Sequence, residues 1–366
     1  MEAWQTKLNH QMENIGWGKF QYYVFAVCFT AWANDLMWMV GFGFILYIQA
    51  DEWGLSTSDI GLYESIVFVG LLLGSYFWSY VADRYGRMRS FKRQIYILFI
   101  GALGMTCSIS LGMIVPFAFF MGFAIGGELA LGGTVYKEFI PASSSSTICI
   151  LMIGFNVGNL IVALLCMMAC AGDFGGLAGW RWMCIFMLVL EASWIVLRLK
   201  MPETPFFLAS QGRMEECQEV LNQISMTNRG IPLEESLLDI NPIPSKESPK
   251  VKKADDSKVL FFKLFQKNYL RPTLLFGLFG FMNDVPLVGV LFFMPEILAE
   301  VGSGGTTCFY SYMTSAIQQA ACVPACYIAY KLLDTRMGRK WSIIIYTFTS
   351  GVFMFAFLLV QNFAGI

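Results

Sequence analysis

Residues 79–90 read SYVADRYGRMRS, a charged turn between two long apolar runs. The turn contains Asp83, Arg84, Gly86, Arg87 and Arg89. Residues 330–340 read YKLLDTRMGRK and repeat the order Asp, Arg, Gly, Arg between two further apolar runs, with one extra residue before the glycine. This second turn contains Asp334, Arg336, Gly338 and Arg339. A charged turn that occurs twice in a hydrophobic chain predicts two homologous halves, which is a transporter architecture.

The composition indicates an integral membrane protein. Of 366 residues, 56% are hydrophobic and 14% are charged, and the mean hydropathy is +0.57. A soluble chain carries about 25% charged residues. The formal net charge of −1 suggests no nucleic-acid partner. The ten cysteines lie mostly in apolar segments without metal-ligand spacing. We therefore expect no disulfide framework, metal, cofactor or enzymatic site.

Nine apolar segments are each long enough to cross a bilayer, which takes about 20 residues of helix. They are 21–48, 59–82, 91–113, 116–140, 148–171, 181–200, 272–299, 310–333 and 342–361. A polar stretch separates the sixth segment from the seventh and contains one short helical pattern, GRMEECQEVLNQI. We predict an N-terminal six-helix bundle over 1–200, a cytoplasmic linker over 201–270 and a partial, three-helix C-terminal bundle over 271–366.

The basic residues fix the predicted orientation. With the N-terminus in the cytoplasm, both charged turns and the linker lie inside, and the outer loops contain only Arg181. Gly86 and Gly338 then permit sharp turns. Asp83 and Asp334 can accept hydrogen bonds from a neighbouring helix N-terminus. The arginines can pair with carboxylates of the opposing bundle and close the inner face. The alternative is that the two turns are ordinary basic loops on the cytoplasmic side. The repeated order of Asp, Arg, Gly and Arg argues against that alternative.

Several ordered motifs resemble the major facilitator superfamily. DRYGR and DTRMGRK are similar to its two signature loops. Other stretches resemble the synaptic vesicle glycoprotein 2 and organic cation/anion transporter branch: IGWGKFQYYVF, AWANDLMWM, EWGLSTSDIGLYESIVFVGLLLGSYFW, GFAIGGELALGGTVYKEFIP, GWRW and PETPFFLASQGRMEE. The resemblance covers essentially the whole chain and implies an all-α major facilitator fold. It also adds Glu138 and Glu203, which lie in these motifs, to the cytoplasmic gating residues.

The chain departs from the family pattern at several positions. Ser79 replaces a glycine, and Ala118 and Phe206 replace arginines. The loop PASSSST lacks the usual basic residues, and nine apolar segments stand where the superfamily fold has twelve. These departures support a second hypothesis: a transport-inactive, truncated relative that serves as an accessory subunit of a membrane complex, with other subunits replacing the missing helices.

Acidic residues inside apolar segments are functional candidates, because a buried charge is costly in a membrane. They are Asp35, Glu64, Glu128, Glu191 and Asp284, and we expect no lysine or arginine at comparable depth. The resemblance places the first, fourth and seventh segments around a central cavity. It therefore implies substrate or proton binding by Asp35, Trp38, Glu128, Asn283 and Asp284. Glu191, on a peripheral segment, is expected to have only a packing or lipid-facing role.

An acidic cavity attracts a cation or binds protons, and Trp38, one turn from Asp35, could stack on an organic cation. In the alternative interpretation the acids are protonated or hydrogen-bonded to Asn156, Asn159, Gln318 or Gln319. We predict a multi-pass secondary transporter of a small organic ion, cationic or proton-coupled, that works by alternating access. Its partners are the lipid bilayer and the substrate, in the plasma membrane or an intracellular vesicle membrane.

Overall fold

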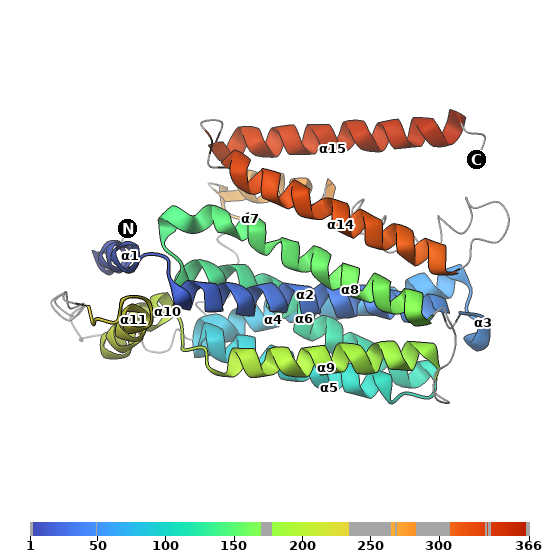
Figure 1. The fold of residues 1–366 in the computed structure, drawn as a ribbon, viewed down its shortest axis with the longest axis horizontal. Helices are drawn as coiled ribbons and strands as arrows, with labels where there is room; N and C mark the ends of the chain where they lie inside the picture. The colour runs from blue at the N-terminus through green and yellow to red at the C-terminus, as the bar shows by residue number, and fades with distance from the viewer. Residues whose placement is uncertain are drawn as a thin grey trace.

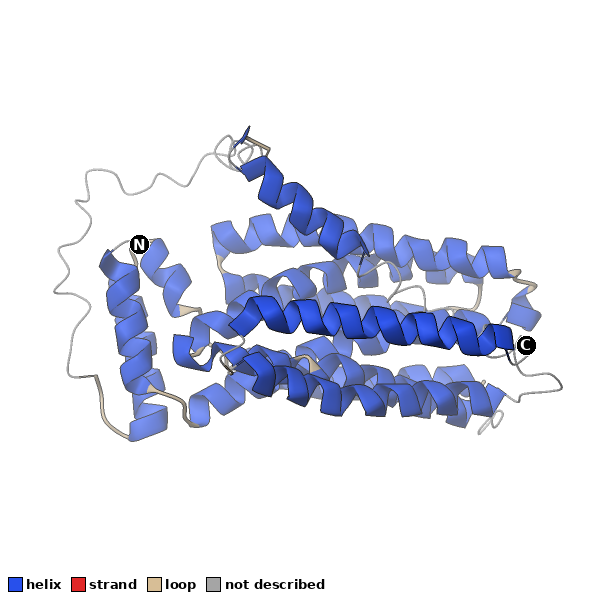
Figure 2. Ribbon diagram, turned by 90° about the horizontal axis from the view of Figure 1, so that it is seen from above, coloured by secondary structure: helices blue, strands red, loops and turns tan. Residues whose placement is uncertain are grey.

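The structure, a computed structural model, describes residues 3–48, 50–169, 178–233, 265–267, 269–282, 308–333, 335 and 338–363. The regular elements within these ranges are all helices (Figure 2). The prediction of an all-α protein is therefore confirmed for the described chain. Four predicted site residues lie outside the described residues, namely Asn283, Asp284, Asp334 and Arg336.

The first half of the chain forms a bundle of long, roughly parallel helices (Figure 1). Its members are α2 (Lys19–Ile48), α4 (Thr57–Tyr85), α5 (Arg87–Thr106), α6 (Leu111–Phe139), α7 (Ile148–Leu151) with α8 (Ile153–Ala169), and α9 (Gly179–Leu199). A four-residue helix, α3 (Ala50–Trp53), follows α2. Helix α2 lies centrally and contacts α4, α6, α8 and α9. Among the described residues, five helical segments are long and apolar enough to cross a membrane: α2, α4, α6, α9 and the stretch Ala142–Ala169.

Two further long helices belong to the second half. Helix α14 (Cys308–Leu333) contacts α8, and α15 (Gly338–Phe363) contacts α14 (Figure 1). The amide of Asn156 on α8 donates to the Cys326 sulfur on α14 at 3.6 Å. The predicted seventh segment is described only up to residue 282, as a helix over 269–282. The division into six plus three helices stays a prediction.

Helices α4 and α6 approach each other through glycines. A Cβ atom built on Gly74 would collide with the backbone of Phe123, and one built on Gly126 would collide with the backbone of Leu71. Only residues without a side chain permit such close backbone contact. These glycines are therefore structural.

One predicted helix boundary is wrong. The sequence placed the break between the third and fourth segments at 114–115, directly before Pro116. In the structure α5 ends at Thr106 and α6 already begins at Leu111, so Pro116 lies inside α6. Pro116 is the sixth residue of α6 and lies just beyond the four N–H groups that have no partner in the helix, so α6 lacks the bond that this N–H would have donated to the Gly112 carbonyl oxygen. The residue that begins α6 is preceded by Ser110, a typical N-cap residue type.

The N-terminal residues, which none of the predicted segments covers, form the amphipathic helix α1 (Ala3–Ile15). Its buried side chains are Trp4, Leu8, Gln11, Met12 and Ile15, which recur at helical spacing. They share an apolar core with α10 (Pro205–Ser210) and α11 (Met214–Arg229). The predicted short helix after the sixth segment is thus confirmed as α11. All three helices gather at one end of the bundle (Figure 1).

Candidate functional site

A small polar groove lies where α2, α8 and α14 meet. Its lining residues are Val40, Phe44, Asn159, Ala163, Ser315, Gln318 and Gln319. Three of these carry amides, which both donate and accept hydrogen bonds. The sequence proposed these amides as partners for the buried acids, whereas the structure places them on the surface that the first half shares with α14. The groove therefore presents neutral polar groups between the two halves.

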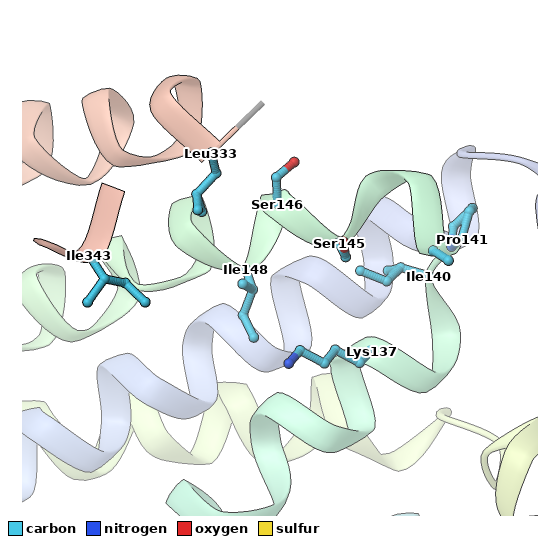
Figure 3. Close-up of a pocket in the computed structure, with 9 residues that line it drawn as sticks. Lys137, Ile140, Pro141, Ser145, Ser146, Ile148, Leu333 and Ile343 are labelled. Atoms are coloured by element: carbon cyan, nitrogen blue, oxygen red, sulfur yellow. The ribbon is translucent and has the colours of Figure 1, made fainter. Parts of the chain in front are cut away.

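A larger cavity of about 640 Å³ lies between the same two parts of the chain. Its first wall contains Lys137 and Ile140 near the end of α6, Pro141, residues of the 3₁₀ turn η1 (Ala142–Thr147) and Ile148. Leu333 and Ile343, from α14 and α15, form the other wall (Figure 3). Figure 3 shows the Lys137 side chain reaching toward Ile148. Lys137 is exposed and is the one charged residue among the described residues that line the cavity.

Four charged side chains gather inside the first bundle, and we call them the buried charge cluster: Asp35, Glu128, Glu191 and Arg198. They expose 0%, 0%, 0% and 1% of their surface, respectively. The Arg198 guanidinium forms an ion pair with Glu128 and lies 4.5 Å from the centroid of the Phe91 ring. The charged groups that act on Asp35 are Glu128, Arg198 and Glu191, all from the first half.

One expectation about these charges is wrong, and one of the two alternatives given for Glu191 is excluded. An arginine does reach the depth of the acids, because Arg198 begins at the last turn of α9 and directs its side chain into the bundle. Glu191 does not face lipid, since it is fully buried and lies beside Trp38 and Asn34. Glu191 and Arg198 are seven residues apart, which places them on one helix face, and this spacing was the signal that could have linked them.

Trp38 is fully buried against this cluster. The predicted roles of Asp35, Trp38 and Glu128 in binding substrate or protons stay predictions. The geometry favours protons over a bulky substrate, because none of the three side chains has exposed surface.

The first charged turn forms a network at the end of the bundle near α10. Arg87 forms an ion pair with Glu138 and lies 4.0 Å from Asp83, whose side chain is 74% exposed. The carboxylate of Glu203 accepts the backbone N–H of Met88 at 2.8 Å, at the first turn of α5. A negative group is stabilised there by the unpaired N–H groups and the helix dipole.

Gly86 provides the turn between α4 and α5 with a φ of 120°, a region that favours glycine. A Cβ at this position would collide with the Glu203 carboxylate. Arg84 donates to the Tyr80 hydroxyl at 2.8 Å.

The described bonds of this turn stay within the first bundle or reach Glu203 at the start of the linker, so the expected pairing with the opposing bundle is not seen among the described residues. In the second turn, Gly338 is the first residue of α15. The side chain of Arg339 is not among those that the structure describes.

The sequence also missed two polar contacts that fix this end of the bundle. Lys92 donates to the carbonyl oxygens of Leu199 at 2.8 Å and Met201 at 2.7 Å, at the C-terminus of α9. A cation there complements the helix dipole. Asn228, at the end of α11, accepts the backbone N–H of Phe20 at 2.9 Å and so anchors α11 to the start of α2.

Comparison with known proteins agrees with this architecture. The "Sugar (and other) transporter" family matches residues 9–364. Organic cation/carnitine transporter 7 of Arabidopsis thaliana is 26% identical over 384 residues, which cover 95% of this chain and 75% of the relative. The synaptic vesicle 2-related protein of Bos taurus is 27% identical over 318 residues, which cover 86% of this chain and 53% of the relative. The resemblance to that branch is therefore confirmed.

Among solved structures, the partially occluded inward-open xylose transporter XylE from E. coli superimposes with a TM-score of 0.62 at 18% identity. The alignment covers 87% of this chain and 74% of that chain. At this identity the likeness shows the fold alone, and that fold is the one the signature turns predicted. The chain belongs to the sugar (and other) transporter family of the major facilitator superfamily.

Proposed function

We propose that this protein is a secondary transporter that moves a small organic ion by alternating access. The observation that carries the proposal is the shared position of the groove and the cavity, both of which lie between the first bundle and the helices α14 and α15. In alternating access a central site opens to each side in turn as two bundles rock against each other. When the bundles rock, a path between them opens first to one side of the membrane and then to the other, so a substrate bound there is exposed to each side in turn.

The groove has a volume of only about 10 Å³, room for about one water molecule, so its polar groups would meet a small organic ion only after the two bundles move apart. Asn159, Ser315 and Gln319 are mostly buried there, with exposed fractions of 6%, 7% and 6%. The amide oxygen of Asn159 has no hydrogen-bond partner among the described residues, so a substrate donor that reaches it gains a bond at a buried acceptor. Val40 and Phe44 of α2 supply an apolar wall.

The charge of the substrate follows from the charges that face this path. The cationic preference expected from the sequence depended on Asp35, Glu128 and Asp284. The first two are sealed in the buried charge cluster and the third lies outside the described residues. Lys137 faces the inner cavity instead and favours an anionic group there. We therefore propose an organic anion as the first substrate class to test and an organic cation as the second.

Uptake into proteoliposomes tests the proposal. The probes are radiolabelled benzoate, tetraethylammonium and a zwitterionic amino acid, each with and without an inward proton gradient. Gln319→Ala should lower uptake of the transported probe about tenfold, which is the effect of losing about 1.4 kcal/mol of binding in a buried polar site. Ile317→Ala is the matched control, because Ile317 lies on the same helix and is 62% exposed. Folded wild-type protein that moves no member of a broad organic-ion panel would favour the accessory-subunit hypothesis.

A further inference from the structure

We propose that Tyr312 closes one end of the interface between the first bundle and α14, and that its unpaired hydroxyl keeps this closure easy to reverse. The inference concerns the opening of the interface in the folded protein. Its meaning for transport rests on the proposed function, in which one end of the path is closed while the other is open.

The Tyr312 side chain inserts from α14 into the first bundle. It is fully buried and belongs to the same apolar core as Phe44 of α2 and Cys166 of α8. The centroids of the Tyr312 and Phe44 rings lie 4.7 Å apart, and Phe44 also lines the groove. A buried aromatic ring contributes much of the apolar contact that an interface can gain. Tyr312 therefore holds the first turns of α14 against the bundle.

The contact between α14 and the first bundle weakens along the helix from this point. Ser315, Ala316 and Gln319 follow Tyr312 on one helix face and are buried. The described side chains of α14 beyond Gln319 are all half-buried or exposed, and Leu333 at its end lines the cavity of about 640 Å³. Figure 1 shows α14 running at an angle to α7 and α8. The interface is therefore closed where α14 begins and open where it ends.

The Tyr312 hydroxyl weakens the closure that the ring supports. It is buried and has no hydrogen-bond partner among the described residues. Its neighbours include the Cys166 thiol, which is only a weak hydrogen-bonding group. A buried tyrosine usually finds a partner for its hydroxyl, and an unpaired hydroxyl keeps the full cost of leaving water. When α14 moves away from the bundle, the hydroxyl regains water and this cost disappears.

The ring and the hydroxyl of Tyr312 thus have opposite effects on the same contact. The ring stabilises the closed interface through its apolar contacts, and the hydroxyl destabilises it. A protein that changes between two conformations needs states that differ little in free energy. Phenylalanine at this position would close the interface more firmly, because it has the same ring without the unpaired hydroxyl. Tyrosine leaves the closed state close enough in free energy to the open state for α14 to move.

The rate at which N-ethylmaleimide labels an engineered Ser315→Cys in lipid nanodiscs tests the proposal. Ser315 lines the groove, whose volume of about 10 Å³ cannot admit the reagent, so labelling requires the interface to open. Site-resolved mass spectrometry separates this thiol from the native ones.

Two substitutions of Tyr312, each made in the Ser315→Cys protein, should change this rate in opposite directions. Tyr312→Ala removes the ring and should speed labelling roughly a hundredfold, whereas Tyr312→Phe removes only the unpaired hydroxyl and should slow it about tenfold. Ile317→Ala is the control, because Ile317 lies on the same helix and is exposed, and it should leave the rate unchanged.

Faster labelling in Tyr312→Phe than in the parent protein would overturn the proposal, since it would mean that the hydroxyl is bonded in the closed state and supports it. An unchanged rate in Tyr312→Phe would also contradict the role given to the hydroxyl. That variant nearly preserves the shape of the side chain, so it decides the question even if Tyr312→Ala does not fold. The rates are measured without any substrate. Rates that change as expected in a protein that transports no probe would therefore count against the proposed function alone.

Discussion

The Arg198 guanidinium on α9 forms an ion pair with the Glu128 carboxylate on α6, although the two side chains expose only 1% and 0% of their surface. Each charge compensates the other in a place where water cannot. The pair therefore connects a helix at the edge of the first bundle to α6, which contacts both α2 and α4.

Arg198→Met should lower the free energy of unfolding by about 3–5 kcal/mol, because it removes one partner of a buried pair and leaves the other uncompensated. Denaturant unfolding in mixed micelles measures the change. The double variant Arg198→Met/Glu128→Leu should recover much of the loss. Arg213→Ala is the control, since Arg213 pairs with Glu216 at an exposed site and should show little change. Equal effects at both sites would contradict the buried-pair account.

Glu203 and Gly86 should contribute to stability through one contact. Glu203→Gln removes a negative charge from the first turn of α5 and should lower stability by roughly 0.5–2 kcal/mol, which is typical for helix N-terminal caps. Gly86→Ala should cost about 1–3 kcal/mol, because alanine is strained at a φ of 120° and its Cβ meets the Glu203 carboxylate. Both are measured as shifts of the thermal unfolding midpoint. Glu219→Gln, on an exposed face of α11, is the control and should not shift it.

Arg87 should matter more than Asp83 for closure of the inner face. Arg87 pairs with half-buried Glu138, whereas the Asp83 side chain is 74% exposed. We expect Arg87→Ala to increase maleimide labelling of an engineered Ser146→Cys at the cavity about tenfold, and Asp83→Ala to change it little, because exposed pairs contribute little energy. Equal labelling in wild-type and Arg87→Ala protein would rule out a gating role for this arginine.

The membrane segments and the family could be predicted because both signals are local in the sequence. An apolar run of about 20 residues identifies a span without any knowledge of its neighbours. The signature turn around Gly86 likewise needs only a few ordered residues. Helix α1 was missed because most of its residues are polar and only four large apolar ones, such as Leu8 and Met12, recur at helical spacing. These four become buried only when α11 packs against them.

The buried charge cluster could be predicted only in part. Asp35 and Glu128 stand out because they interrupt apolar runs. Arg198 sits near the end of its segment, where a long side chain ordinarily reaches the interface. The spacing of seven residues from Glu191 indicates a shared helix face, but the inward direction of Arg198 depends on packing against Phe91 and pairing with Glu128, which lie on other helices.

Cys217 on α11 should resist alkylation in the folded protein. It is fully buried and its Sγ lies 3.3 Å from the Pro205 carbonyl oxygen. Burial raises the pKa of the Cys217 thiol to about 12. The reactive thiolate is therefore nearly absent from pH 7 to pH 9, and raising the pH through this window should not accelerate labelling as it does for an ordinary thiol. Mass spectrometry after iodoacetamide treatment, with exposed Cys107 as the reactive control, measures this. Rapid labelling of native Cys217 would contradict the docked position of α11.

The final prediction concerns the orientation in the membrane that the basic residues indicate. With the N-terminus in the cytoplasm, the linker lies inside and the end of α5 lies at the outer face. In a variant that keeps only Cys107, an impermeant maleimide added to intact cells should label the protein, because Cys107 is exposed at the C-terminal end of α5. In a variant that keeps only an engineered Ser257→Cys in the linker, the same reagent should label only after the membrane is permeabilised. Two sites on opposite sides make the result independent of expression level, since each variant is its own control before and after permeabilisation. Labelling of Ser257→Cys in intact cells together with protection of Cys107 would invert the topology and place both charged turns outside.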